Sequence, residues 1–148
     1  MNDWEDKCWG KTRCISLTGT YSQHDLCLEP AGSFCSLHYH ENRSNIFAVT
    51  RGVVRVVWLM EWEVRYCTLT EKSMSLMIRA NVIHQFQVLE EGFMIETYQC
   101  DGKSIISVDD IHRLSVGGTT NIDLQKEVAI LLPNGDKWLP AKPILPLF

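Results

Sequence analysis

The sequence lacks the features that mark membrane proteins and nucleic-acid-binding proteins. No apolar run among its 148 residues approaches the roughly 20 residues that a membrane helix needs, and Val53–Met60, one of the longest, is interrupted by Arg55. Basic residues are scarce, with 14 Lys+Arg against 18 Asp+Glu and a formal net charge of −4. Such a chain has no general electrostatic attraction for nucleic acid or anionic lipid. We therefore expect neither a membrane nor a nucleic acid as a partner.

The cysteines lack the spacing of a common metal or redox motif. No two of them form C-x-x-C, which argues against a zinc ribbon or a thioredoxin-type motif; they are Cys8, Cys14, Cys27, Cys35, Cys67 and Cys100. The N-terminal residues are acidic and contain no apolar signal-peptide core. We therefore expect a reducing, cytoplasmic compartment in which these cysteines are free thiols.

What the sequence does have is a series of short stretches in which apolar and polar residues alternate. Val53–Met60 alternates in this way and Trp62–Leu69 repeats the pattern, which predicts a hairpin. Turn residues such as Gly52 and Glu90–Gly92 separate most of the stretches. Many short strands at close spacing are typical of an antiparallel sandwich or barrel. The other predicted strands are Arg13–Leu17, His24–Leu28, Cys35–His40, Ile46–Thr50, Met74–Ile78, His84–Leu89 and Phe93–Tyr98.

The C-terminal part of the chain has a different composition. Four of the five prolines lie in the last 16 residues, although this segment is also apolar. Proline lacks the backbone N–H of a sheet ladder and favours edge or extended structure. We therefore predict a β-barrel with N-terminal strands over residues 1–118 and an extended, proline-rich C-terminal extension over residues 119–148. An apolar extension must be buried, either on an edge of its own barrel or on a second subunit, and the second alternative predicts a homodimer.

Three of the five histidines form a candidate metal site. His38 and His40 are two residues apart on a predicted strand, so both imidazoles point to the same side of the sheet. His84 begins a later strand. Three converging imidazoles leave open positions for water or substrate. An isolated H-x-H pair is a weak signal, and we expect His24 and His112, outside the pattern, to be structural or at the surface.

The residues around His38 and His40 resemble the first motif of the cupin superfamily, which reads G-x5-H-x-H-x3-4-E-x6-G. Gly32, both histidines and Gly52 match this motif in register. Asn45 stands where the family has its glutamate.

The second cupin motif, G-x5-P-x-G-x2-H-x3-N, resembles residues 78–88 more loosely. His84 falls on the position of the metal ligand, whereas Arg79, Asn81 and Val88 replace the proline, glycine and asparagine of the motif. The resemblance covers about Trp9–Leu114. It implies an all-β fold, the double-stranded β-helix of the cupin or jelly-roll barrel.

Within the cupins, the sequence is most similar to the C-terminal domain of type II phosphomannose isomerases. The shared segments are Trp9-Gly10, Ser36–His40, Ile95–Tyr98 and Val108–Leu114. This resemblance implies descent from a metal-dependent aldose–ketose isomerase.

Asn45 changes the chemistry that the resemblance implies, because the family glutamate supplies the carboxylate of a three-His, one-Glu site. A site of His38, His40, His84 and Asn45 would have four neutral ligands and leave the charge of a divalent cation uncompensated. Mn²⁺ and Mg²⁺ prefer carboxylate oxygens, so we expect Zn, Ni, Fe or Cu rather than Mn or Mg. Such a site favours an anionic ligand. Alternatively, Asn45 orients a water molecule or another ligand.

Further candidate residues lie near the motifs. Glu96 and Tyr98 share one face of a late strand. If that face is the barrel interior, they are candidate catalytic acid–base or substrate-binding groups, and otherwise Glu96 is solvated. Arg43 and Arg79 flank the site in sequence and are candidates to bind a substrate anion. Cys35 has the opposite strand parity from His38, and we expect it to face away from the metal.

These residues leave four functions open. The first is a metal-dependent isomerase or epimerase of a sugar-like or carboxylated metabolite, in which the metal polarises a carbonyl and Glu96 moves a proton. The second is a three-His Fe(II) dioxygenase, which the loss of the carboxylate at Asn45 suggests. The third is a non-catalytic cupin that binds a small molecule such as a sugar, and the fourth is a cupin that has lost its metal. Fold alone does not choose among them.

Overall fold

The computed structural model describes residues 3–61, 63–100, 102, 104–132, 137–140 and 142–143. Every regular element within these residues is a β-strand, so the prediction of an all-β fold is confirmed. In the same residues, no helix is long and apolar enough to cross a membrane.

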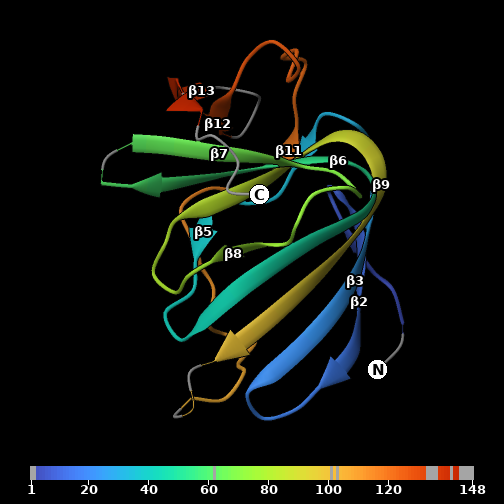
Figure 1. Ribbon diagram of the computed structural model, residues 1–148, viewed down its shortest axis with the longest axis vertical. Coiled ribbons are helices and arrows are strands. Elements are labelled where there is room, and N and C mark those ends of the chain that lie inside the picture. The colour runs from blue at the N-terminus through green and yellow to red at the C-terminus, as the bar shows by residue number, and fades with distance from the viewer. Residues whose placement is uncertain are drawn as a thin grey trace.

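One large, curled sheet forms the barrel (Figure 1). Its main path runs in the order β1-β2-β3-β9-β6-β7-β14. Neighbouring strands on this path are antiparallel, except that β14 runs parallel to β7. The strands of the path are β1 (Glu5–Lys7), β2 (Gly10–Leu17), β3 (Tyr21–Leu28), β6 (Arg43–Met60), β7 (Glu63–Leu69), β9 (His84–Cys100) and β14 (Lys142–Pro143).

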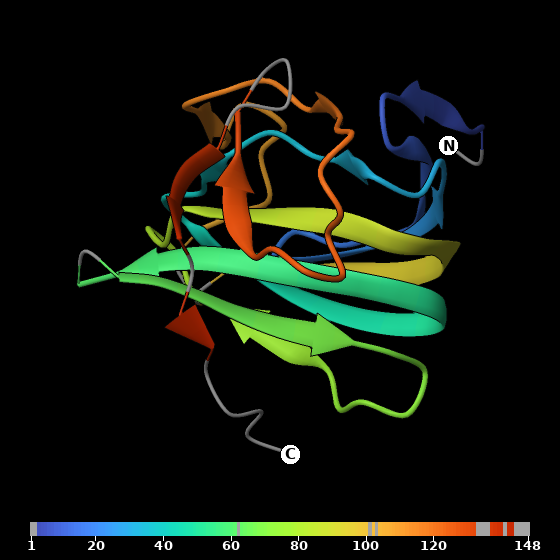
Figure 2. The same cartoon turned by 90° about the horizontal axis from the view of Figure 1, so that it is seen from above.

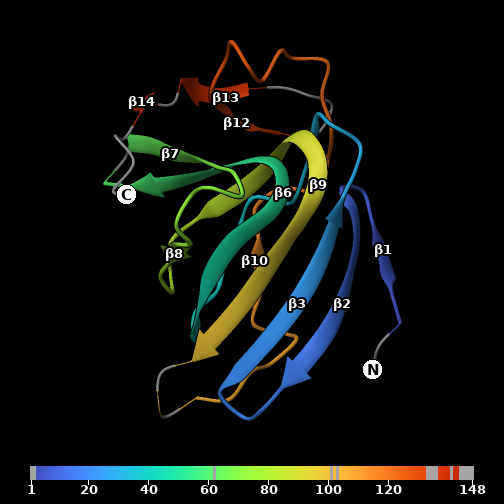
Figure 3. The same cartoon turned by 45° about the vertical axis from the view of Figure 1, so that its right-hand side comes forward.

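Short strands complete the barrel beside this path. β5 joins β9 to β10, and β4 joins β9 to β11. β12 and β13 form a separate two-stranded sheet that lies above β6 and β7 in Figures 1 and 3. The short strands are β4 (Ser33–Phe34), β5 (His38–Tyr39), β8 (Leu76–Ile78), β10 (His112–Arg113), β11 (Gly118–Thr119), β12 (Ala129–Leu131) and β13 (Lys137–Pro140).

Two of the predicted turns are wrong, because the chain bends there without leaving the sheet. The predicted turn at Gly52 lies inside β6, and the predicted turn at Glu90–Gly92 lies inside β9. The pairing of β6 with β9 shifts its register between Val49 and Val54, which marks an irregular, bulged segment. A β-bulge sharpens the bend and twist of a strand. Each long strand therefore continues past the bend from one part of the barrel into another. The predicted hairpin of β6 with β7 is present. Trp62, at its turn, lies outside the described residues.

The barrel core lies between the inner faces of the long strands. Because side chains on a strand alternate between two faces, the apolar residues of one parity meet inside the barrel. The largest cluster includes Leu26, Leu28, Phe47, Val54, Val56, Trp58, Phe86, Val88 and Met94.

The first part of the C-terminal extension packs on the barrel of its own chain. Ile130 on β12 is fully buried and packs with Leu37 and Val57. The side-chain amides of Gln85 and Gln87 on β9 donate hydrogen bonds to the carbonyl groups of residues 131 and 129. In Figure 2 this orange segment crosses in front of the long strands. Much of the proline-rich end, including residues 133–136 and 144–148, lies outside the described residues.

The bend of the long strands predicts a strong effect of a single methyl group. A Cβ on Gly92 would lie 1.9 Å from the carbonyl oxygen of Arg51, and Gly52 has a φ of +86° with a would-be Cβ 2.5 Å from the oxygen of Glu91. We expect Gly92→Ala to lower the free energy of unfolding by about 1–3 kcal/mol, the usual cost of overpacking a rigid site. Urea unfolding measures this value. The control is Gly102→Ala, whose added Cβ would meet nothing within 4 Å, and equal stability of both variants would contradict the bend.

Candidate metal centre

Three imidazoles converge at one point inside the barrel. The ligand nitrogens of His38, His40 and His84 all lie within 4.8 Å of one another. The pairing of β5 with β9 sets His38 directly opposite His84, and His40 follows β5 on the same side. All three side chains are buried. The structure thus brings together the three histidines that the sequence singled out.

Backbone carbonyl groups fix the orientation of each ring. A carbonyl oxygen can only accept a hydrogen bond, so the Nδ1 atom facing it must carry the proton. The Nε2 atom of each ring then carries the lone pair that can bind a metal. The acceptors are the carbonyl groups of Ser36 for His38 (2.7 Å), Asp110 for His40 (2.6 Å) and Val82 for His84 (2.9 Å).

These rings fit a divalent transition metal. The Nε2 atom of His40 is buried and has no hydrogen-bond partner among the described residues. Burial lowers the pKa of His40 to about 3 and that of His84 to about 4, and it holds the pKa of His38 well below its usual value. All three rings are therefore neutral near pH 7, the form that coordinates metals. Three imidazoles suit Zn, Ni, Cu or Fe.

Asn45 lies beside the histidines and contacts a carboxylate. Its amide nitrogen lies 3.4 Å from Nε2 of His84 and donates a hydrogen bond of 3.2 Å to Oε2 of Glu96. Its Oδ1 is buried without a partner among the described residues. The hydroxyl of Tyr98 donates to the other oxygen of Glu96 at 2.5 Å. Asn45 therefore bridges the histidine cluster and a buried carboxylate.

Glu96 lies inside the barrel, which answers the question that the sequence left open. Its side chain is 9% exposed. Burial raises the pKa of Glu96, whereas the hydrogen bonds from Tyr98 and Asn45 and the charge of Arg43 act in the opposite direction. The sequence predicted four neutral ligands and an uncompensated cation. The structure adds a carboxyl group one hydrogen bond beyond Asn45, where its ionised form would balance part of that charge.

The two arginines predicted to bind a substrate anion have different positions. Arg43 is 7% exposed, and its Cζ atom lies 3.9 Å from the centre of the Tyr98 ring. Its Nη1 donates a hydrogen bond of 3.0 Å to the carbonyl of Ser107. Arg79 is exposed and is not among the described residues that line the cavity. It follows the buried Ile78 where β8 ends, so the chain turns its side chain outward.

A cavity of about 570 Å³ opens onto this site. His38, Arg43, Glu96 and Tyr98 line it from inside. Cys35 also lines it, so the prediction that Cys35 faces away is wrong. Residues 35–37 do not form a strand, and strand parity therefore does not apply to them.

Sequence reasoning missed several groups that line the cavity, among them His24 and Arg113. His24 on β3 lines it, with its Nε2 3.1 Å from the hydroxyl of Ser22 and its ring edge-on to Tyr98. The shared parity of Ser22 and His24 with the buried Leu26 was a usable signal. Arg113 of β10 lies at the mouth, and only its pairing with His38 reveals this position. His112 is outside the cavity lining and stacks on Tyr39.

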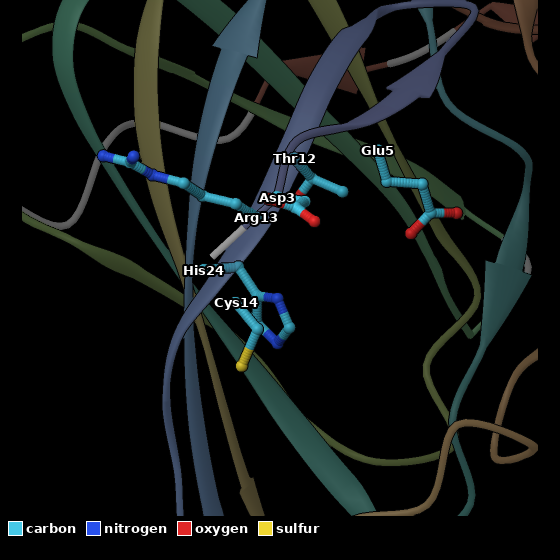
Figure 4. Close-up of a pocket in the computed structure, with 6 residues that line it drawn as sticks. All are labelled: Asp3, Glu5, Thr12, Arg13, Cys14 and His24. Atoms are coloured by element: carbon cyan, nitrogen blue, oxygen red, sulfur yellow. The ribbon is translucent and has the colours of Figure 1, made fainter. Parts of the chain in front are cut away.

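A second pocket of about 310 Å³ adjoins the first at the N-terminal hairpin of β1 and β2. Figure 4 shows Cys14 and His24 close together in it, as expected for cross-strand partners. These two residues, with Glu5 and Thr12, also line the larger cavity. The hairpin therefore forms one wall of the cavity mouth.

The converging rings predict metal uptake that depends on each histidine. We expect His38→Ala, His40→Ala and His84→Ala each to weaken Zn²⁺ or Ni²⁺ binding by more than the roughly 10–100-fold typical of losing an outer hydrogen-bond partner. His112→Ala, outside the cavity lining, should bind as the parent chain does. Elemental analysis and calorimetric titration of metal-free protein measure the binding. Equal uptake by all four variants would rule out this site.

The depressed histidine pKa values predict that the metal-free chain is sensitive to acid. An unfolded histidine binds a proton below pH 6.5, whereas folded His84 does so only near pH 4. As the pH is lowered, the unfolded state gains protons first. The free energy of unfolding therefore decreases as the pH decreases through this window, by up to about 1.4 kcal/mol per pH unit for one histidine. Urea unfolding between pH 6.5 and 4.5, with chelator present, should show a shallower slope for His84→Asn than for the parent. Identical slopes would contradict the neutral, buried ring.

Comparison with known proteins identifies the fold. No family model and no curated protein matches the sequence. Among solved structures, the oxalate decarboxylase of Bacillus subtilis at pH 4.6 matches with a TM-score of 0.64 and 19% identity over 76% of this chain and 30% of that one. The formate complex of Lactobacillus farciminis oxalate decarboxylase matches with a TM-score of 0.63 and 18% identity over 76% of this chain and 34% of that one. The chain thus spans about a third of these enzymes, and the nearer resemblance to phosphomannose isomerases stays a prediction. The curled all-β barrel and these neighbours together show that the chain has the cupin fold.

Proposed function

We propose that the chain is a metal-dependent enzyme that moves a proton on a small metabolite, as an isomerase or epimerase does. The observation that carries this proposal is the carboxyl group of Glu96, which lines the same cavity as His38 of the histidine cluster. It is linked to His84 through the amide of Asn45, by contacts of 3.2 and 3.4 Å. A buried carboxyl group beside a metal site is the arrangement that general acid–base chemistry requires.

The surroundings of Glu96 suit a group that both takes and returns a proton. Its two oxygens accept hydrogen bonds from the hydroxyl of Tyr98 and the amide of Asn45, which stabilise the carboxylate. Burial favours the neutral acid and raises the pKa above its usual value. Opposing influences of this kind bring a carboxyl group towards the pH at which a catalytic base works best.

The proton transfer needs no partner beyond the substrate. In an isomerase reaction, Glu96 would take the proton from the hydroxyl-bearing carbon next to a carbonyl group and return it to the carbonyl carbon, while the hydroxyl proton passes to the former carbonyl oxygen. In an epimerase reaction, it would return the proton to the same carbon after the planar intermediate has turned its opposite face to Glu96. The C–H bond that breaks is thus replaced by one that forms, and no external oxidant or reductant is consumed. A metal held by His38, His40 and His84 would supply the Lewis acid that polarises the carbonyl.

The identity of the metal is part of the proposal. We expect Zn, Ni, Fe or Cu, because the ligand cluster of the described residues consists of three imidazoles and contains no carboxylate. Bacillus subtilis oxalate decarboxylase, a structural neighbour, has Mn(II) centres. Mn²⁺ is therefore the informative competitor in any binding comparison.

A three-His Fe(II) dioxygenase is the second candidate. It is favoured by the ligand cluster, which contains only histidines among the described residues. Oxygen consumption by the iron-loaded chain with thiol or diketone substrates distinguishes it from the isomerase. A non-catalytic, small-molecule-binding cupin would instead show thermal stabilisation by ligands without any product.

Replacing the carboxyl group of Glu96 tests the main proposal. Metal-loaded protein is incubated in D₂O with aldoses, their phosphates and 2-hydroxy acids, and NMR follows the exchange of carbon-bound hydrogen. We expect exchange by the parent and a loss of about 10²–10⁴-fold in Glu96→Gln, the usual range for removing a general base. Metal content should be unchanged.

The matched control is Glu41→Gln, the same substitution at an exposed carboxylate that pairs with His112 outside the cavity lining. It should keep full exchange. An absence of exchange by the parent with every substrate and metal, or full exchange by Glu96→Gln, would contradict the proposal.

Two properties of the whole protein stay proposals. We propose that the chain is cytoplasmic and forms a homodimer. The apolar, proline-rich extension supports a dimer contact, although Ile130 and Leu131 within it are buried on their own barrel. Light scattering during size-exclusion chromatography measures the mass of the particle and decides between monomer and dimer.

A further inference from the structure

The cavity contains a buried cation whose hydrogen-bonding capacity is only partly used. Arg43 is 7% exposed and lines the cavity. Its Nη1 donates to the carbonyl of Ser107. Its Nε is buried and has no hydrogen-bond partner among the described residues. Burying a charged donor without a partner is costly, so a ligand that accepts from Nε would be stabilised.

No carboxylate of the described residues forms an ion pair with this guanidinium. Asp110 and Glu96 interact electrostatically with Arg43, but both carboxyl groups are already hydrogen-bonded to other groups. The oxygens of Asp110 accept from the backbone N–H groups of Glu41 and Asn42 at 2.8 and 3.0 Å. Those of Glu96 accept from Tyr98 and Asn45. Within the described part of the chain, Nε of Arg43 therefore keeps a hydrogen bond that an anionic ligand could accept.

One side of the cavity wall is apolar. The rings of Trp9 and Phe86 pack edge-on, with their centroids 5.0 Å apart, and form this side of the cavity. Ile106 and Ile111 contribute to the wall, and Val108 is exposed at the mouth. A sugar carries a hydroxyl on nearly every carbon, and each one buried against this side would need a hydrogen-bond partner that its apolar side chains do not offer. A ligand with one charged end and an apolar body matches both parts of the cavity.

We propose that this cavity binds a carboxylic acid with an apolar body, its carboxylate on Arg43 and its body against the wall of Trp9 and Phe86. This inference rests on the proposed function, because it names the substrate class of the same site. The planar fork of a guanidinium matches a carboxylate with two parallel hydrogen bonds. A phosphate ester presents similar oxygens, so the test includes both anions.

Calorimetry of the metal-loaded full chain with four probes tests the ligand class. The probes are 3-phenylpropionate, its uncharged amide 3-phenylpropanamide, acetate and mannose 6-phosphate. We expect 3-phenylpropionate to bind most tightly and its amide at least about tenfold more weakly, because the amide lacks the charge that Arg43 would pair with. Acetate should also bind more weakly, because it has no apolar body. Equal binding of acid and amide, or tighter binding of mannose 6-phosphate, would overturn the proposal.

Two arginine variants test the role of Arg43. Arg43→Gln should weaken 3-phenylpropionate at least about tenfold and leave the amide unchanged. The matched control is Arg113→Gln, which removes the other guanidinium of the cavity, exposed at the mouth. It should change the affinity far less. Unchanged amide binding and metal content also show that the cavity of Arg43→Gln is intact, and equal losses in the two variants would overturn the assignment.

A third variant keeps the test decisive if Arg43→Gln does not fold. Trp9 belongs to the apolar wall and is only partly buried, so Trp9→Ala removes part of that wall without replacing a fully buried core residue. It should weaken 3-phenylpropionate but not acetate, and no change for either would overturn the apolar wall. Carboxylate binding without deuterium exchange would contradict the proposed enzyme and leave this inference standing. Exchange on sugars without any preference for carboxylates would do the reverse.

Discussion

Three backbone carbonyl groups determine what this cavity can do, because each one accepts the Nδ1 proton of a histidine and so directs Nε2 to a shared point. The carbonyls belong to Ser36, Val82 and Asp110, which lie far apart in the sequence. The site therefore exists only when the strand β5, the start of β9 and the segment before β10 are assembled. Metal binding and folding must be coupled, since an unfolded chain cannot present the three nitrogens together.

The long strands β6 and β9 bring the charged groups to these neutral rings. Arg43 and Asn45 lie near the start of β6, and Glu96 lies opposite on β9. The result is a buried carboxyl group and a buried guanidinium beside three uncharged imidazoles. Asn45 takes the place of a carboxylate ligand in the motif, and its amide contacts both His84 and Glu96. A carboxyl group thus stays near the site although the motif has lost its glutamate.

Much of this arrangement could be predicted from the sequence. The alternation of apolar and polar residues predicted the β fold. The i, i+2 spacing predicted that His38 and His40 share a face, and the resemblance to the cupin motif added His84. The bends in β6 and β9 could not be told from turns, because glycine serves a bulge and a turn equally well. Strand pairing was also hidden, so the inward position of Glu96 and the outward position of Arg79 required the structure, whereas the parity of His24 with Leu26 was a signal that the sequence analysis did not use. The orientation predicted for Cys35 was wrong, because strand parity was applied to a segment that does not form a strand.

Anomalous X-ray diffraction from crystals of the metal-loaded chain tests the histidine site most directly. We predict one anomalous peak in the barrel, about 2.0–2.1 Å from the Nε2 atoms of His38, His40 and His84, as zinc–imidazole bonds require. Their Nδ1 atoms should still donate to the three carbonyl groups. A fully loaded crystal with the metal bound elsewhere, or with Nδ1 as the coordinating atom, would contradict the account.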